Sequence, residues 1–225
     1  MTGRIKKAIL LLLQFAGLGA GAQQQNLTQS KTFKQMNAQP KETTTRKMDT
    51  ATFGAGCYWC TEAQFQQLKG VDKVESGFTG GQVDNPTYKE VCNGTTGHAE
   101  VCNIYYDPSI ISFDELLAAF WTCHDPTQLN RQGNDIGTQY RSAIFYHDDM
   151  QRKKSEEYKK KLNEEKVFDK PVVTEIAPFT KFYKAENYHQ NYYNENGDQP
   201  YCTFVVRPKV EKFKKVFKDK MKSDK

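Results

Sequence analysis

The chain has 225 residues, 37% of them hydrophobic, so it can bury one sizeable core, and its length favours one domain with terminal tails. Its formal net charge of +5 arises at the two ends, because residues 52–208 hold 16 Lys and Arg against 22 Asp and Glu, a balance of −6. A protein that binds nucleic-acid phosphates shows the opposite balance, so we expect no nucleic-acid partner.

Residues 1–22 have the pattern of a signal peptide. Arg4, Lys6 and Lys7 precede a short apolar run that ends in Ala20-Gly21-Ala22, a small-residue pattern that signal peptidases accept. The run is shorter than the roughly 20 residues that span a bilayer, and a retained membrane anchor is the alternative interpretation. We therefore expect an exported protein, periplasmic or otherwise extracytoplasmic, that is cleaved near Ala22.

Residues 23–51 are rich in Gln, Thr, Asn and Lys and hold few large apolar side chains. A segment of this composition cannot bury enough surface to offset its chain entropy, so we expect a disordered polar linker. The catalytic domain is then expected at residues 52–208, followed by a Lys-rich C-terminal helix or tail at residues 209–225.

Hydrophobic periodicity and turn residues predict alternating strands and helices in the folded region. Ser112 and Glu115 form a capping box that marks the start of one helix. In chain order we expect a strand at 52–54, a helix at 57–69, strands at 71–78 and 99–106, a helix at 113–123, a strand at 142–146, a helix at 150–164, strands at 172–177 and 203–206, and a terminal helix with Val210, Phe213 and Phe217 on one side.

The first six of these elements follow the order β-α-β-β-α-β. This order is typical of an α+β protein with a ferredoxin-like two-layer α/β sandwich core (βαββαβ), in which two helices cover one face of an antiparallel sheet. The segments 80–97 and 179–202 are rich in Gly, Asn or aromatic residues without regular periodicity. We therefore expect long irregular loops and a C-terminal extension around the core.

The cysteines leave three interpretations open. The six are Cys57, Cys60, Cys92, Cys102, Cys123 and Cys202. An exported protein could join them in three disulfides. The C-x2-C pair could instead be half of a zinc site, although no second pair with metal-ligand spacing follows it, so we expect no metal. In the third interpretation the pair is redox-active.

The stretch GAGCYWC at residues 54–60 favours a reactive thiol. Cys57 follows a strand and a glycine turn, so it begins a helix, where free N–H groups and the helix dipole stabilise a thiolate. Cys60 lies one turn later on the same face, at about the separation that a disulfide needs. Tyr58 and Trp59 add an aromatic surface that suits an apolar group such as a methyl. A thioredoxin-like thiol–disulfide oxidoreductase shares this spacing and is the alternative function.

Four longer motifs occur in a fixed order, GCYWC, NPTYKEVCNGTTGHAEV, GNDIGTQYRSAIF and AENYHQNYY. Together they resemble the peptide methionine sulfoxide reductase A family over about residues 52–208. The resemblance implies an oxidoreductase that reduces the S epimer of methionine sulfoxide, free or in proteins, and so repairs oxidative damage. It also implies that no cofactor is bound, and we expect a monomer.

The resemblance assigns roles to residues of the first motif. It implies that Cys57 attacks the sulfoxide sulfur and that Tyr58 and Trp59 hold the substrate methyl group. His189 also lies in one of the motifs, and we interpret it as structural because no local spacing pairs it with Cys57.

The resemblance also implies a proton donor, Glu100, and a set of residues around the sulfoxide oxygen. Tyr88 and Tyr140 are implied as hydrogen-bond donors to that oxygen, and Asp135 as a residue that lines the same pocket. Strand periodicity places Glu100 on the same face as Cys102, so we expect it to be buried. Burial would raise the pKa of Glu100 and keep it protonated near neutral pH.

Attack by Cys57 leaves a sulfenic acid, which a second thiol must reduce. Many family members have glycine at the position of Cys60 and a resolving cysteine near the C-terminus, whereas this chain has Cys60 and keeps Cys202. Spacing favours Cys60 as the first resolving thiol, with Cys202 as the alternative or a relay. The resulting disulfide must be reopened by thiol exchange, so a thioredoxin-like reductant is expected.

Overall fold

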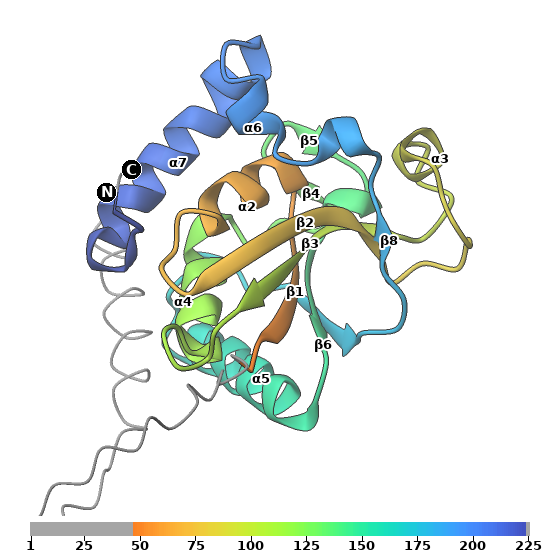
Figure 1. Ribbon diagram of the computed structural model, residues 1–225. Coiled ribbons are helices and arrows are strands. Elements are labelled where there is room, and N and C mark those ends of the chain that lie inside the picture. Colours follow the sequence, from red (N-terminus) through yellow and green to blue (C-terminus); the bar gives the residue numbers. More distant parts are fainter. Residues whose placement is uncertain (1–46, 224–225) are drawn as a thin grey trace, which may run out of the picture.

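The computed structural model of the chain describes residues 47–223 (Figure 1). The predicted signal peptide and all but the last residues of the predicted linker lie outside the described residues. Within the part that is described, no helix is both long and apolar enough to cross a membrane.

The centre of the described chain is a six-stranded sheet. Its strands are β1 (Asp49–Ala55), β2 (Val71–Thr79), β3 (Ala99–Tyr106), β6 (Ser142–Tyr146), β7 (Glu175–Pro178) and β8 (Tyr183–Lys184). They lie in the order β7-β6-β1-β3-β2-β8 (Figure 1). All neighbours pair antiparallel except β6 and β7, which are parallel. The prediction of strands at 71–78, 99–106 and 142–146 is confirmed to within one residue, whereas β1 begins three residues before the predicted strand.

Two helices connect the central strands across the sheet. α2 (Tyr58–Phe65) leads from β1 to β2, and α4 (Phe113–Cys123) leads from β3 to β6. The ring of Phe53 in β1 lies 5.8 Å from that of Phe65 in α2 and 4.9 Å from that of Phe120 in α4. Because one strand residue points to one face of a sheet, both helices cover the same face. The predicted α+β class is confirmed.

The two helices differ in how closely their bounds match the prediction. α4 has the predicted bounds, and its capping box is present, since the Ser112 hydroxyl accepts a hydrogen bond from the N–H of Glu115 and the Glu115 carboxylate accepts one from the N–H of Ser112. α2 ends four residues before the predicted Lys69. The N–H of Lys69 instead donates to the carbonyl of Lys220 at 2.8 Å, so the C-terminal segment binds the chain that follows α2.

The opposite face of the sheet is covered by irregular chain. Phe179 and Phe182 pack there against a buried cluster that includes Val101 and Phe145.

α5 (Asp149–Glu164) lies beside β6 and β7 and matches the predicted helix to within one residue.

The predicted strand at 172–177 starts too early. The N–H groups of Val172 and Val173 donate to Asn163 Oδ1 at 2.8 Å and to the carbonyl of Pro126 at 2.9 Å, so these residues are held away from the sheet. Short elements inside the loops were not predicted: they are α3 (Tyr88–Cys92), β4 (Arg131–Gln132), β5 (Asp135–Ile136) and α6 (Tyr192–Glu195).

The predicted strand at 203–206 is wrong. Cys202–Val206 form a π-helical turn that continues into α7 (Arg207–Val216). Val206 and Val210 are four residues apart and are buried in one apolar cluster with Cys57 and Cys60. Packing at helical spacing therefore overrides the strand propensity of the β-branched residues.

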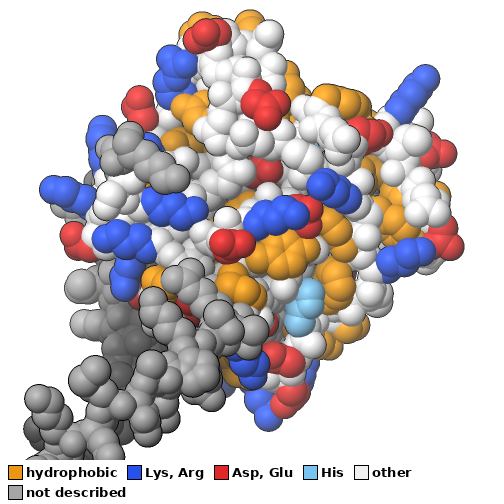
Figure 2. Space-filling model, viewed as in Figure 1, with side chains coloured by type: hydrophobic (Ala, Val, Ile, Leu, Met, Phe, Trp, Pro, Cys, Tyr) orange, Lys and Arg blue, Asp and Glu red, His pale blue; other side chains and the backbone are white. Residues whose placement is uncertain are grey.

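The predicted terminal helix with one apolar side is confirmed as α7. Val210, Phe213 and Phe217 are all buried, and the ring of Phe213 lies 6.0 Å from that of Phe65 in α2. α7 therefore lies along the outer side of α2 (Figure 1). Over the visible face, Lys and Arg side chains are interspersed with Asp and Glu, with more of them on the side where α7 lies (Figure 2).

Candidate active site

A tight turn places Cys57 at the beginning of α2. Gly56 has a φ of +88°, and a Cβ atom there would lie 2.6 Å from the side chain of Gln132, so both conformation and space require glycine. Cys57 is the N-cap residue of α2, so the helix begins at Tyr58, one residue later than predicted. Its sulfur therefore lies at the end of the helix where N–H groups are free of helical partners.

Three of the six cysteines come together at this point. Cys57, Cys60 and Cys202 belong to one buried cluster and are 7%, 2% and 0% exposed, respectively. All six cysteines are free thiols in the structure. No group of three or more His, Cys, Asp or Glu side chains within residues 47–223 is arranged to hold a metal ion. Both candidate resolving thiols therefore lie beside Cys57, which is the most accessible of the three.

The charge of the C-x2-C pair differs from what the helix position alone predicts. Burial raises the pKa of the Cys57 thiol well above its ordinary value, and its hydrogen bond to Cys60 raises it further. The same hydrogen bond lowers the pKa of Cys60, burial opposes this, and the nearby ammonium group of Lys209 lowers it again. Of the two thiols, Cys60 is therefore the one that loses its proton more readily.

Glu100 lies on β3 directly behind the beginning of α2. It is 2% exposed, and its Oε2 accepts a hydrogen bond from the N–H of Tyr58 at 3.1 Å. Burial is the largest cause of the pKa of Glu100 being raised well above its ordinary value. Glu100 is therefore buried, as expected, and its raised pKa favours the protonated form that the prediction requires.

The aromatic residues of the motif occupy different environments. Trp59 stacks on Tyr192 with ring centroids 3.7 Å apart, and its indole N–H donates to His189 Nδ1 at 3.2 Å. Tyr58 is 1% exposed and packs against Phe78 in the core. Trp59 therefore contributes the accessible part of the aromatic surface, while Tyr58 supports it from below.

The remaining predicted residues converge on the same place. Burial raises the pKa of Tyr140, and the charge of Glu100 is the next largest cause. Burial is also the main cause of the raised pKa of Tyr88, to which the charge of Glu100 contributes. The charge of Asp135, at the start of β5, adds to the raised pKa of Glu100. The structure thus brings all predicted site residues into one region.

The structure adds residues that sequence analysis missed. The hydroxyl of Tyr201 donates to Asp135 Oδ2 at 2.9 Å and lies close to the Cys57 sulfur. Tyr201 directly precedes Cys202, so its position in the sequence was the available signal. Lys209 Nζ lies 3.6 Å from Cys60 Sγ, and no local spacing links these two residues.

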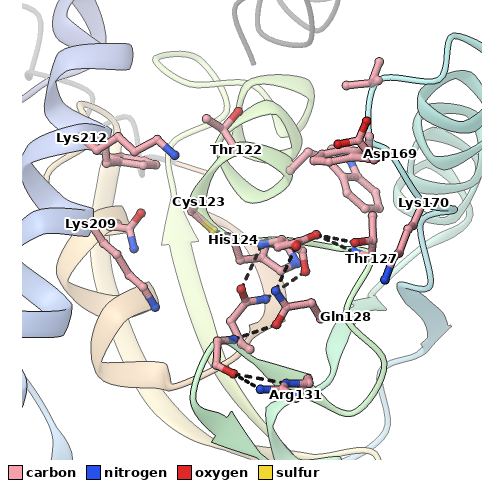
Figure 3. A pocket seen from close by; sticks show the side chains of 18 of the residues that line it. Thr122, Cys123, His124, Thr127, Gln128, Arg131, Asp169, Lys170, Lys209 and Lys212 are labelled. Atoms are coloured by element: carbon pink, nitrogen blue, oxygen red, sulfur yellow. Dashed lines mark hydrogen bonds between the residues drawn. The ribbon is translucent and has the colours of Figure 1, made fainter. Parts of the chain in front are cut away.

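Lys209, whose Nζ contacts the Cys60 sulfur, also lines a cavity of about 880 Å³. Figure 3 shows Lys209 and Lys212 of α7 extending into it, opposite His124 and Gln128. Neither Cys57 nor Glu100 lines this cavity. The sulfur that would meet a substrate therefore lies outside this cavity.

Comparisons with known proteins bear on this arrangement. The family model described as peptide methionine sulfoxide reductase matches residues 49–221. The peptide methionine sulfoxide reductase MsrA of Saccharolobus solfataricus is 55% identical over 175 residues, which are 78% of this chain and 98% of the relative. The reduced form of Mxr1 from Saccharomyces cerevisiae is 34% identical with a TM-score of 0.65, covering 69% of this chain and 90% of that chain. Methionine sulfoxide reductase A of Corynebacterium diphtheriae is 40% identical with a TM-score of 0.60, covering 66% and 75%.

Proposed function

The chain belongs to the peptide methionine sulfoxide reductase family, in its A type, and we propose that Cys57, Cys60 and Glu100 carry its reaction. It is an oxidoreductase that uses thiols to reduce the S epimer of methionine sulfoxide to methionine. The observation that supports these roles is the convergence of a thiol pair and a buried carboxyl group of raised pKa at the beginning of α2. Repair of oxidised proteins follows as the proposed biological role.

The first half-reaction needs a nucleophile and an acid. Cys57 passes its proton to the Cys60 thiolate as its sulfur attacks the sulfur of the sulfoxide. Glu100 gives its proton to the sulfoxide oxygen, because an oxyanion would otherwise develop there. The oxygen is transferred to Cys57 as a sulfenic acid, and methionine is released.

The surrounding side chains suit this substrate. The raised pKa values of Tyr88 and Tyr140, caused mainly by burial, keep both hydroxyl groups protonated, so both remain hydrogen-bond donors for the oxygen. Trp59, held by Tyr192 and His189, offers an apolar ring face to the methyl group. Asp135 positions the Tyr201 hydroxyl, which lies against the Cys57 sulfur.

The second half-reaction needs a resolving thiol, and the two candidates differ in acidity. The pKa of Cys60 is lowered, chiefly by its hydrogen bond to Cys57, whereas burial raises the pKa of Cys202. A thiolate attacks faster than a thiol, so we assign Cys60 as the first resolving residue. Cys202 lies in the same cluster and is proposed as a relay.

A thioredoxin-like protein is the proposed reductant. The Cys57–Cys60 disulfide is reopened when an external dithiol attacks one sulfur and leaves both cysteines reduced. Cys57 is the more exposed of the two sulfurs and is the expected point of attack.

A substrate comparison tests the proposed function. With dithiothreitol as reductant, the protein is expected to convert peptides that contain the S epimer to methionine and to leave the R epimer unchanged. Insulin disulfides are expected to be reduced no faster than by dithiothreitol alone. Rapid reduction of insulin together with an untouched S epimer would instead support a thiol–disulfide oxidoreductase.

We also propose that residues 1–22 direct export, on the strength of their charge and apolar pattern. Cell fractionation is expected to place the mature protein outside the cytoplasm, with an amino terminus near Gln23. An intact chain in the cytoplasmic fraction would contradict this proposal, and an intact chain in the membrane fraction would support the anchor alternative.

A further inference from the structure

Lys209 joins the redox pair to α7. Its Nζ lies 3.6 Å from the sulfur of Cys60, and its side chain is half-buried between that sulfur and the cavity shown in Figure 3. Within residues 47–223, no salt bridge ties Lys209 to a carboxylate. Its charge is therefore available to the thiol.

Packing of α7 fixes where this lysine points. Val206 and Val210 are buried against Cys57 and Cys60. Lys209 lies three residues after the first valine and directly before the second, so it emerges beside the same cluster. Lys212, one turn further along, enters the cavity but has no hydrogen bond to a sulfur among the described residues. The lysine-rich helix thus contains one matched neighbour that serves as a control.

The groups that face Cys60 come from four parts of the fold. They are Cys57 at the start of α2, Asp135 of β5, Cys202 of the π-helical turn with Tyr201 directly before it, and Lys209 of α7. Asp135 disfavours a thiolate, while Lys209 supplies the positive charge in this set. In a buried place, such a charge changes the ionisation of its neighbour more than it does in water.

We propose that Lys209 is a positioning residue for disulfide closure, which holds Cys60 as a thiolate beside the oxidised Cys57. The proposal rests on the proposed function of the thiol pair. In the closing step the Cys60 sulfur attacks the Cys57 sulfur, an S–S bond forms and the S–O bond of the sulfenic acid breaks. The hydroxide takes up the proton that Cys60 released and leaves as water. The Cys57 sulfur is reduced and the Cys60 sulfur is oxidised, so the step needs no further reductant.

The ionisation of Cys60 provides the first test. In a Cys57→Ser background, the alkylation rate of Cys60 is measured against pH by peptide mass spectrometry. Lys209→Met is expected to shift the profile to higher pH and to slow alkylation about tenfold near neutral pH, since one pKa unit changes the thiolate fraction by that factor. Lys209→Arg is expected to restore the profile, and Lys212→Met to leave it in place. Identical profiles for the two methionine variants would overturn the proposal.

A single-turnover experiment with Cys57 intact provides the second test. One equivalent of S-sulfoxide peptide is added without reductant, and methionine, trapped Cys57 sulfenic acid and disulfide are measured over time. In Lys209→Met the disulfide is expected to lag methionine by about tenfold, with sulfenic acid accumulating. Equal closure rates with and without Lys209 would overturn the inference alone, because methionine release would still support the proposed function. Absence of methionine from the unmodified protein would overturn both.

Discussion

Cys57→Ser is expected to abolish methionine formation, with kcat/KM falling by at least about a thousandfold. A serine hydroxyl is a weak nucleophile at neutral pH and cannot carry the oxygen as a sulfenic acid. Oxygen transfer to this sulfur is the step on which the proposed mechanism depends. The measurement is methionine released per protein chain after addition of excess S-sulfoxide peptide.

Cys60→Ser is the matched variant, because it removes the same atom from the same helix one turn away. With a thioredoxin-like protein as the only reductant, which recycles the parent protein, it is expected to release about one methionine per chain and then to stop, since Cys57 remains as a sulfenic acid. A disulfide map by mass spectrometry should show no bond in the stalled protein. Full recycling in Cys60→Ser, with a Cys57–Cys202 bond, would move the resolving role to Cys202.

Glu100→Gln is expected to slow the first half-reaction by about a hundredfold or more, which is the usual contribution of a general acid. Glutamine has nearly the same shape, and its carbonyl can still accept the hydrogen bond from the N–H of Tyr58. What it lacks is a transferable proton. Single-turnover methionine release measures the loss, which should shrink at low pH, where solvent acids replace the missing donor.

The pH dependence of folding separates a catalytic loss from a structural one. Burial raises the pKa of Glu100 above its unfolded value, so the folded protein keeps a proton that the unfolded chain releases. The stability that this proton provides is present at low pH and is lost as pH rises. Glu100→Gln should therefore be at least as stable as the parent near neutral pH. An unchanged rate at neutral pH would remove Glu100 from the acid role.

The elements that were predicted well have strong local signals. The bounds of α4 are predicted because Ser112 and Glu115 mark its start, and the end of β3 is predicted because Asp107-Pro108 follows it. The segment 203–206 was mistaken because its β-branched residues favour a strand, while contacts with α2 impose helical spacing. α3 carried a capping box of Thr87 and Glu90 that could have been recognised.

The site residues fall into the same two groups: some lie in local sequence motifs, and others reach the site only through tertiary packing. Cys57 and Glu100 lie in recognisable motifs, whereas Tyr201 and Lys209 reach the thiols from about 140 to 150 residues away through packing. The ionisation of Cys57 was misjudged because the helix dipole contributes only about 0.3–1 kcal/mol at exposed sites. Burial shifts a pKa by up to about 3–5 units, each equal to about 1.4 kcal/mol, so it outweighs the dipole.

The raised pKa of Cys57 affects how readily oxidants attack the protein. Peroxides attack thiolates far faster than thiols, and Cys60, the thiol of the pair with the lowered pKa, is only 2% exposed. The oxidants that convert methionine to its sulfoxide therefore react slowly with these two thiols before substrate binds. The protein can remain active under the oxidising conditions in which its substrate forms.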